Sequence, residues 1–182
     1  MKRTGTITMV LVVGACFLSG CASRTKEAAT QSIAPIARPE RPIGYQAIRR
    51  VDGAEEVYTL VAKTADTETW DSPRGCRAVY PRTGFAPPVK FSNCNGSSGT
   101  QVVKLLRGTP YPLTVGGKWA YSYEGKSPSG DRWSGELHCE VASAARVRVD
   151  TIDHDVCTVV CEDNIGTVKT TYTYTIYREQ YP

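Results

Sequence analysis

Residues 133–141 read WSGELHCEV, and in this stretch apolar or small residues alternate with polar ones. A period of two places Trp133, Gly135, Leu137, Cys139 and Val141 on one face of a strand, and the polar residues face water. A helix would instead repeat its apolar residues every three to four positions. The stretch therefore predicts a half-buried β-strand.

Similar runs occur along most of the chain from residue 45 onward. They cover residues 57–63, 101–107, 119–123, 146–149 and 171–176, and turn sequences such as Asn95-Gly96 and Gly116-Gly117 lie between them. Thr and Tyr are common in these runs, and both suit a pleated, half-buried surface. Closely spaced strands joined by short turns favour an antiparallel meander. We predict an all-β domain of about eight strands, as an open barrel or strongly curved sheet; a two-sheet sandwich is the alternative.

The N-terminus has the pattern of an export signal. Lys2 and Arg3 precede an uncharged apolar run from Ile7 to Leu18. At about 12 residues this run is too short to cross a bilayer as a helix, which needs roughly 20. Residues 18–21 read LSGC, which resembles the lipobox of bacterial lipoproteins. The resemblance implies cleavage before Cys21 and a permanent anchor of two or three acyl chains such as palmitate, whereas one chain binds membranes only marginally.

The residues after the lipobox bear on the destination of the chain. Ala22 and Ser23 follow the cysteine, and neither is Asp. In Gram-negative lipoproteins this resembles the pattern that is sent to the outer membrane. The resemblance implies a protein that is lipid-anchored in the outer membrane and faces the periplasm.

Composition divides the chain into three parts. A signal peptide at residues 1–20 leaves 162 residues, which suits one domain plus a tether. Residues 21–44 contain Ala, Thr, Ser and Pro without an apolar period, and we predict a lipidated, flexible and disordered tether. Residues 45–182 are predicted to form a disulfide-bonded β domain.

Charge follows the same division. The whole chain carries +4, and removal of Lys2 and Arg3 leaves +2. Residues 22–50 hold six basic and two acidic side chains, and residues 51–182 hold 14 basic and 16 acidic ones. A basic segment beside a lipid anchor suits anionic headgroups or cell-wall polymer. Export argues against a nucleic-acid partner.

Five of the seven cysteines remain once Cys16 leaves with the signal and Cys21 takes lipid. They are Cys76, Cys94, Cys139, Cys157 and Cys161. The periplasm is oxidising, so disulfides are expected. Cys76 and Cys94 flank a Pro-rich loop and are predicted to pair. Cys157 and Cys161 lie on one strand-like run, about 13 Å apart at ~3.3 Å per residue, which is beyond disulfide reach. Either one could meet Cys139 on a neighbouring strand; we predict Cys139–Cys161, with Cys157 free and buried.

Few residues of this sequence could take part in catalysis or metal binding. His154, Cys157 and Cys161 have the order of zinc ligands, but oxidation competes with metal binding and the cysteines lie in a strand-like run. A Cys157–His154 thiol nucleophile lacks an identifiable third group. No G-x-S-x-G or H-E-x-x-H motif occurs. We therefore predict no enzyme activity, catalytic residue, cofactor or metal.

Aromatic residues leave two interpretations open. Trp70, Trp119, Trp133 and ten tyrosines are a rich apolar set for a small domain. They fit a packed core, or the lining of a site for an apolar or sugar ligand if a curved sheet leaves space.

Several motifs resemble a family of uncharacterised exported β-rich domains of proteobacteria. The resemblance covers roughly residues 45–180, and it rests on residues 69–76, 85–87, 91–94, 112–119, 137–141 and 158–163. It implies that Cys139 and Cys161 correspond to the family's cysteines, and that Cys157 stands where an aromatic residue is usual. The chain departs from the family at residues 150–154, where a Pro-Ala-Gly turn is typical. The resemblance implies a fold and no activity.

The sequence thus favours a periplasmic lipoprotein that acts as a non-enzymatic module and binds an envelope protein or cell-wall component. A carrier or sensor of an apolar ligand in an open barrel is the first alternative. A metal- or thiol-dependent enzyme is the second. A deep aromatic-lined cavity would favour the carrier, and a filled core would favour the interaction module.

Overall fold

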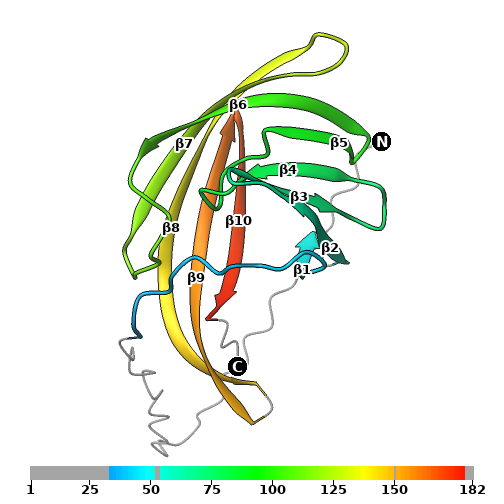
Figure 1. Ribbon diagram of the computed structural model, residues 1–182. Coiled ribbons are helices and arrows are strands. Elements are labelled where there is room, and N and C mark those ends of the chain that lie inside the picture. Colours follow the sequence, from blue (N-terminus) through cyan, green and yellow to red (C-terminus); the bar gives the residue numbers. More distant parts are fainter. Residues whose placement is uncertain (1–32, 52–53, 150, 179–182) are drawn as a thin grey trace, which may run out of the picture.

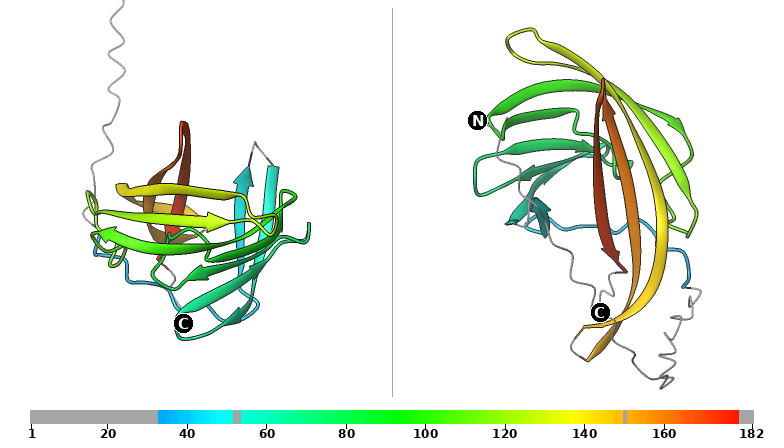
Figure 2. Two further views of the ribbon diagram at one scale, coloured as in Figure 1. Left: turned by 90° about the horizontal axis from the view of Figure 1, so that it is seen from above. Right: turned by 180° about the vertical axis from the view of Figure 1, so that it is seen from behind.

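Ten strands form one antiparallel sheet, in which each strand pairs with the next along the chain. The computed structural model describes residues 33–51, 54–149 and 151–178. The sheet is strongly curved and stays open between its first and last strands (Figures 1 and 2). The strands are β1 (Gln46–Val51), β2 (Ala54–Lys63), β3 (Thr67–Asp71), β4 (Arg77–Pro81), β5 (Lys90–Cys94), β6 (Ser97–Arg107), β7 (Lys118–Lys126), β8 (Arg132–Val149), β9 (Ile152–Ile165) and β10 (Val168–Tyr177).

The predicted open, strongly curved meander is confirmed, and the sandwich alternative is not observed. The sheet has ten strands rather than about eight. Strands β3, β4 and β5 have five residues each, which is too short for an alternating pattern to stand out from the turns beside it. Among the described residues, no helix is long and apolar enough to cross a membrane.

The alternation in residues 133–141 has the predicted effect. Leu137, Cys139 and Val141 are buried, whereas Glu136 is exposed. Trp133 lies across two neighbouring strands, because a Cβ added to Gly125 would come within 2.2 Å of its indole and one at Gly99 within 2.6 Å. Only glycine leaves room for this ring at those two positions.

Strands β8 and β9 form a long hairpin that continues past β7. The pairing of β7 with β8 ends at Lys118 and Glu140, whereas β8 and β9 remain paired as far as Val149 and Ile152. Val147 is 40% exposed because it lies in this extension.

The concave face of the sheet is filled by side chains and loops. Phe85, from the loop between β4 and β5, lies 5.3 Å from Trp119 and 5.4 Å from Tyr174 between ring centroids. Leu113, from the loop before β7, is 1% exposed. The buried cluster consists of Ile36, Ala86, Leu113, Trp119, Tyr121, Leu137, Cys139, Val141, Ala144, Cys157, Val159 and Cys161.

The prediction that the tether reaches residue 44 is wrong for its second half. Residues 33–44, which we call the strap, cross β8, β9 and β10 before they enter β1 (Figure 1). Ile36 in the strap is 3% exposed and belongs to the core cluster. The strap has no apolar period because only a few of its side chains point at the sheet, so its sequence resembles a linker. The remainder of the predicted tether, residues 21–32, lies outside the described residues.

Candidate functional site

The strap is fixed at its first half by backbone hydrogen bonds. Ile36 and Leu113 form an isolated antiparallel bridge: the Ile36 amide donates to the Leu113 carbonyl (3.1 Å) and the Leu113 amide to the Ile36 carbonyl (2.8 Å). The Arg178 guanidinium, just after β10, donates to the carbonyls of Ala34 and Pro35. The strap therefore joins the loop before β7 to the end of the last strand.

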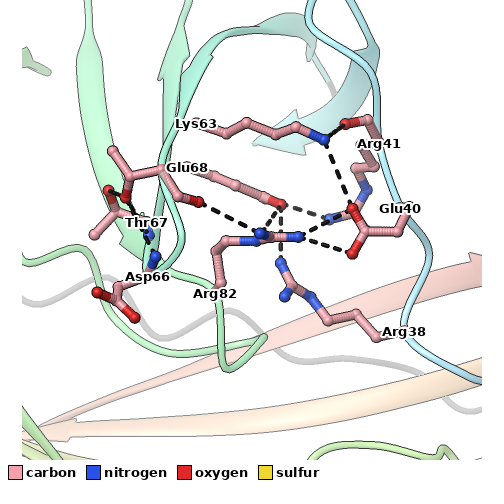
Figure 3. A network of polar contacts seen from close by, with 9 residues as sticks. Arg38, Glu40, Arg41, Lys63, Asp66, Thr67, Glu68 and Arg82 are labelled. Carbon is pink, nitrogen blue, oxygen red and sulfur yellow. Dashed lines mark hydrogen bonds and ion pairs between the residues drawn. The ribbon is translucent and has the colours of Figure 1, made fainter.

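The second half of the strap is held by ion pairs and hydrogen bonds between charged side chains. Glu68 on β3 faces the concave side and is 5% exposed, which makes it the most buried charged residue of the described chain. The Arg38 guanidinium donates to Glu68 Oε1 at 2.9 Å, and a nitrogen of Arg41 lies 3.6 Å from Oε2. Arg82 Nε lies 3.9 Å from the same carboxylate (Figure 3). A buried carboxylate requires such partners, because an unpaired buried charge is costly.

A second carboxylate joins the same cluster from the strap. Arg82 donates to both oxygens of Glu40, at 2.8 and 3.0 Å. Lys63 lies 3.6 Å from Glu40 and donates to the Arg41 carbonyl at 3.0 Å. We call these six residues the clasp: Arg38, Glu40, Arg41, Lys63, Glu68 and Arg82 (Figure 3).

The clasp has more positive than negative groups. Four cations and two carboxylates leave a formal charge of +2. The Arg41 guanidinium also lies over the rings of Tyr45 and Trp70, at 5.6 and 5.9 Å from their centroids, which is within the range of a cation–π contact. Ion pairs of both polarities therefore join the strap to the sheet: Arg38 and Arg41 of the strap pair with Glu68, and Glu40 of the strap pairs with Lys63 and Arg82.

The cysteines of the described chain form two bridges. The disulfides are Cys76–Cys94 and Cys139–Cys161, the pairs favoured by the sequence, and Cys157 is a buried free thiol. Cys139 and Cys161 are direct partners in the β8–β9 register, with Cα atoms 4.0 Å apart. Burial raises the pKa of the Cys157 thiol, and Arg178 partly opposes this effect. Cys21, the predicted lipidation site, lies outside the described residues.

The double variant Cys76→Ala/Cys94→Ala tests the contribution of the first bridge. The bridge closes a loop with a sequence separation of 18. We expect the variant to lose about 3 kcal/mol of unfolding free energy, because the unfolded chain gains the entropy of the open loop. Urea denaturation measures the loss. Parent and variant are both unfolded in buffer without reductant. An unchanged urea midpoint in the variant would contradict this expectation.

Neither His138 nor His154 forms a hydrogen bond with Cys157. His138 lies on the outer face, where Nε2 is 2.9 Å from Glu136 and Nδ1 is 3.3 Å from Arg107. His154 packs edge-on against Tyr177. Cys161 is oxidised in its disulfide and cannot act as a thiolate ligand. In residues 33–51, 54–149 and 151–178, no group of three or more His, Cys, Asp or Glu side chains could hold a metal ion.

The tryptophans pack against protein. Trp119 is 1% and Trp70 is 8% exposed, and Trp133 donates to Gln101 Oε1 at 3.1 Å. Two shallow hollows lie on the described surface, one beside Thr69 and Val79 and the other over residues 122–124 and 134–136. Both lie on the outer side of the sheet, since their lining side chains alternate with the buried ones.

Tyr123 and Asp163 form a polar pair on the concave face. The Tyr123 hydroxyl donates to Asp163 Oδ1 at 2.6 Å. Burial raises the pKa of Asp163 above its ordinary 3.8, and the Tyr123 hydrogen bond partly opposes the shift. Burial and the neighbouring carboxylate both raise the pKa of Tyr123. The folded environment therefore disfavours the ionised form of Asp163.

Asp163→Asn tests this pair through its pH dependence. Between the unfolded pKa of about 3.8 and the raised folded pKa, the native state binds more protons, so Asp163 lowers stability as pH rises. The amide of Asn does not titrate and its oxygen still accepts from Tyr123. We expect the stability of the variant relative to the parent to be highest near neutral pH and to fall as pH drops through that window. Parallel urea titrations from pH 7 to pH 3.5 measure the difference; a constant difference would contradict the raised pKa.

Comparison with known proteins adds a remote likeness to a solved structure. No protein-family model and no curated protein matches the chain. The crystal structure of the hypothetical lipoprotein YmcC from Escherichia coli (K12) is similar over 76% of this chain and 75% of that chain, with 11% sequence identity and a TM-score of 0.42. At that level of similarity, the function of this chain has to be argued from its own residues.

Proposed function

We propose that this protein is an outer-membrane lipoprotein, anchored through Cys21, whose β domain faces the periplasm and serves as a non-enzymatic interaction module. Two features of the sequence support the anchor: the LSGC motif at residues 18–21 and the short apolar run before it. Two disulfides suit an oxidising compartment.

The observation that carries the interaction module is the filled concave face. A carrier requires an internal space for its ligand. Here the aromatic side chains of that face pack on one another, and Ile36 of the strap and Leu113 close over the cluster. Binding of an envelope component at the surface is thus favoured over enclosure of an apolar molecule.

The strap shortens the predicted connection to the membrane. If Cys21 carries the lipid, 11 residues, 22–32, separate it from the strap. At most ~3.6 Å per residue, they span about 40 Å. The domain would then work close to the membrane surface and would not reach across the periplasm.

Anchoring is tested in a Gram-negative host by labelling cells with a palmitate analogue. The label is expected on the full chain, to be lost in Cys21→Ala, and to move from the outer to the inner membrane fraction in Ala22→Asp. Label that persists in Cys21→Ala would contradict the anchor. A stoichiometric apolar molecule extracted from the purified domain would contradict the interaction module and favour the carrier.

A further inference from the structure

The last strand of the sheet, β10, has a free edge (red in Figure 1). It pairs with β9 along all of its ten residues without a bulge. Among the described residues, no other strand has a Cα atom within 8 Å of β10. Phe85 packs against Tyr174 on the concave face, whereas the hydrogen-bonding groups of a strand point sideways, in the plane of the sheet. The outer backbone groups of β10 therefore have no strand partner within the described chain.

One hydrogen bond shows which residues of β10 face this edge. The Arg178 amide, just after β10, donates to the Asp155 carbonyl at 2.8 Å, and these two residues continue the β9–β10 register. Hydrogen-bonded and non-hydrogen-bonded pairs alternate along an antiparallel ladder. The odd-numbered residues of β10 therefore direct their backbone N–H and C=O groups away from β9; they are Lys169, Thr171, Thr173, Thr175 and Tyr177.

The two edges of the sheet differ in how well they are protected. Edge strands usually avoid pairing with other chains by being short, charged, bulged or interrupted by proline. β1 has six residues, two of which are arginine. β10 has ten residues, and all except Lys169 are Val, Ile, Thr or Tyr, which favour strands. The sequence of β10 therefore provides little protection against pairing with a further strand.

The sequence of β10 is also close to symmetric about its middle. Tyr172 and Tyr174 flank Thr173, and Thr171 and Thr175 follow on either side. Two antiparallel copies with Thr173 opposite Thr173 place each Tyr172 opposite a Tyr174, and each Thr171 opposite a Thr175. Aromatic pairs and Thr–Thr pairs are favourable across neighbouring strands. The edge is thus complementary to a second copy of itself.

We propose that two copies of this protein associate through β10, with Thr173 on a two-fold axis perpendicular to the sheet. Such an axis makes the two strands antiparallel and joins the two sheets edge to edge. The two Thr173 residues form a hydrogen-bonded pair, because their backbone groups face the free edge. Lys169 lies opposite Tyr177 of the second copy, so like charges do not meet. The proposal goes beyond binding of an envelope component, and it does not depend on the anchor at Cys21, which the palmitate experiment decides separately.

Thr173→Pro tests the association in solution, in the mature chain with Cys21→Ser so that lipid plays no part. A single strand pair is a small interface, so we expect the parent to exchange between monomer and dimer in the micromolar range, measured by sedimentation velocity. Proline removes the outward N–H of the central pair, leaves the hydrogen bonds to β9, and is tolerated on an edge strand. We expect dimerisation to weaken by at least about tenfold, with an unchanged circular dichroism spectrum.

The matched control is Thr173→Val, which keeps the N–H and the β-branched shape. This variant is expected to dimerise as the parent does. A parent that stays monomeric at every concentration would overturn the proposal. A dimer that persists unchanged in Thr173→Pro would show that another surface forms it, and would overturn the proposal as well.

Cysteine cross-linking tests the register and does not require the proline variant to fold. Thr173→Cys places two thiols in a pair whose Cα atoms are about 5.5 Å apart, within disulfide reach. In Thr171→Cys the two thiols are four residues, about 13 Å, apart along the paired strands and out of reach. Under mild oxidation, a non-reducing gel is expected to show a covalent dimer for Thr173→Cys and little for Thr171→Cys. Equal cross-linking of the two variants, or none in either, would overturn the proposal.

Discussion

Glu68→Gln is expected to lower the free energy of unfolding by about 3 kcal/mol. The substitution keeps the size of the side chain and removes the buried negative charge to which Arg38 and Arg41 are paired. Removal of one partner of a buried ion pair typically costs about 3–5 kcal/mol, because the remaining charge is left uncompensated. The lower value applies here since the arginine side chains are 19–23% exposed and keep some contact with water. Urea denaturation followed by tryptophan fluorescence measures the loss.

The matched control is Glu40→Gln in the same clasp. Glu40 has a 70% exposed side chain, and its contacts with Lys63 and Arg82 are screened by solvent. We expect a loss of at most about 1 kcal/mol. Hydrogen exchange adds a local test, because the Ile36 amide donates to Leu113 and is expected to lose protection in Glu68→Gln alone. Equal stability of the two variants would show that the clasp does not hold the strap.

Trp119→Ala is expected to destabilise the domain by about 3–5 kcal/mol, the range for loss of a buried large aromatic side chain. Trp119 is 1% exposed and lies against Phe85 on the concave face. Its strand neighbour is Cys139, whose disulfide holds the adjacent strands together, so the surrounding structure cannot collapse easily into the space. Because the substitution removes a fluorophore, circular dichroism is the appropriate probe.

Trp119→Phe separates packing from hydrogen bonding. The Trp119 indole nitrogen is buried and has no hydrogen-bond partner among the described residues. Phe removes this unpaired donor and keeps most of the ring, so we expect a much smaller loss, about 1 kcal/mol. A loss as large as that of Trp119→Ala would indicate that the indole nitrogen has an essential partner.

Strand-level features could be predicted because they depend on local alternation. Residues 133–141 repeat every two positions, and this alone separates Leu137 and Val141 from Glu136. The separation of Cys157 and Cys161 along one strand makes a bridge between them impossible, and both bridges favoured by the sequence are present. The short strands β3–β5 were missed as separate elements because five residues hold too few repeats.

The clasp was not predicted from the sequence, although the burial of one of its residues, Glu68, could have been. Glu68 and Trp70 are two positions apart in β3, so a strand with Trp70 in the core also places Glu68 on the buried face. A buried carboxylate then requires basic partners. Nothing local indicates which ones, because Arg38 lies 30 residues before Glu68 in the chain.

The sequence by itself thus determined the antiparallel strand pattern and the inward-facing residues of the longer strands, because both depend on the identity and spacing of near neighbours. Only the tertiary structure decided that residues 33–44 belong to the fold. Their contacts to Leu113, Glu68 and Arg178 cross distant parts of the chain, and such contacts exist only after the sheet has curved and brought those three residues together. The strap has no periodic apolar pattern of its own, and its conformation is fixed by the surface on which it packs. That surface is formed by residues elsewhere in the chain.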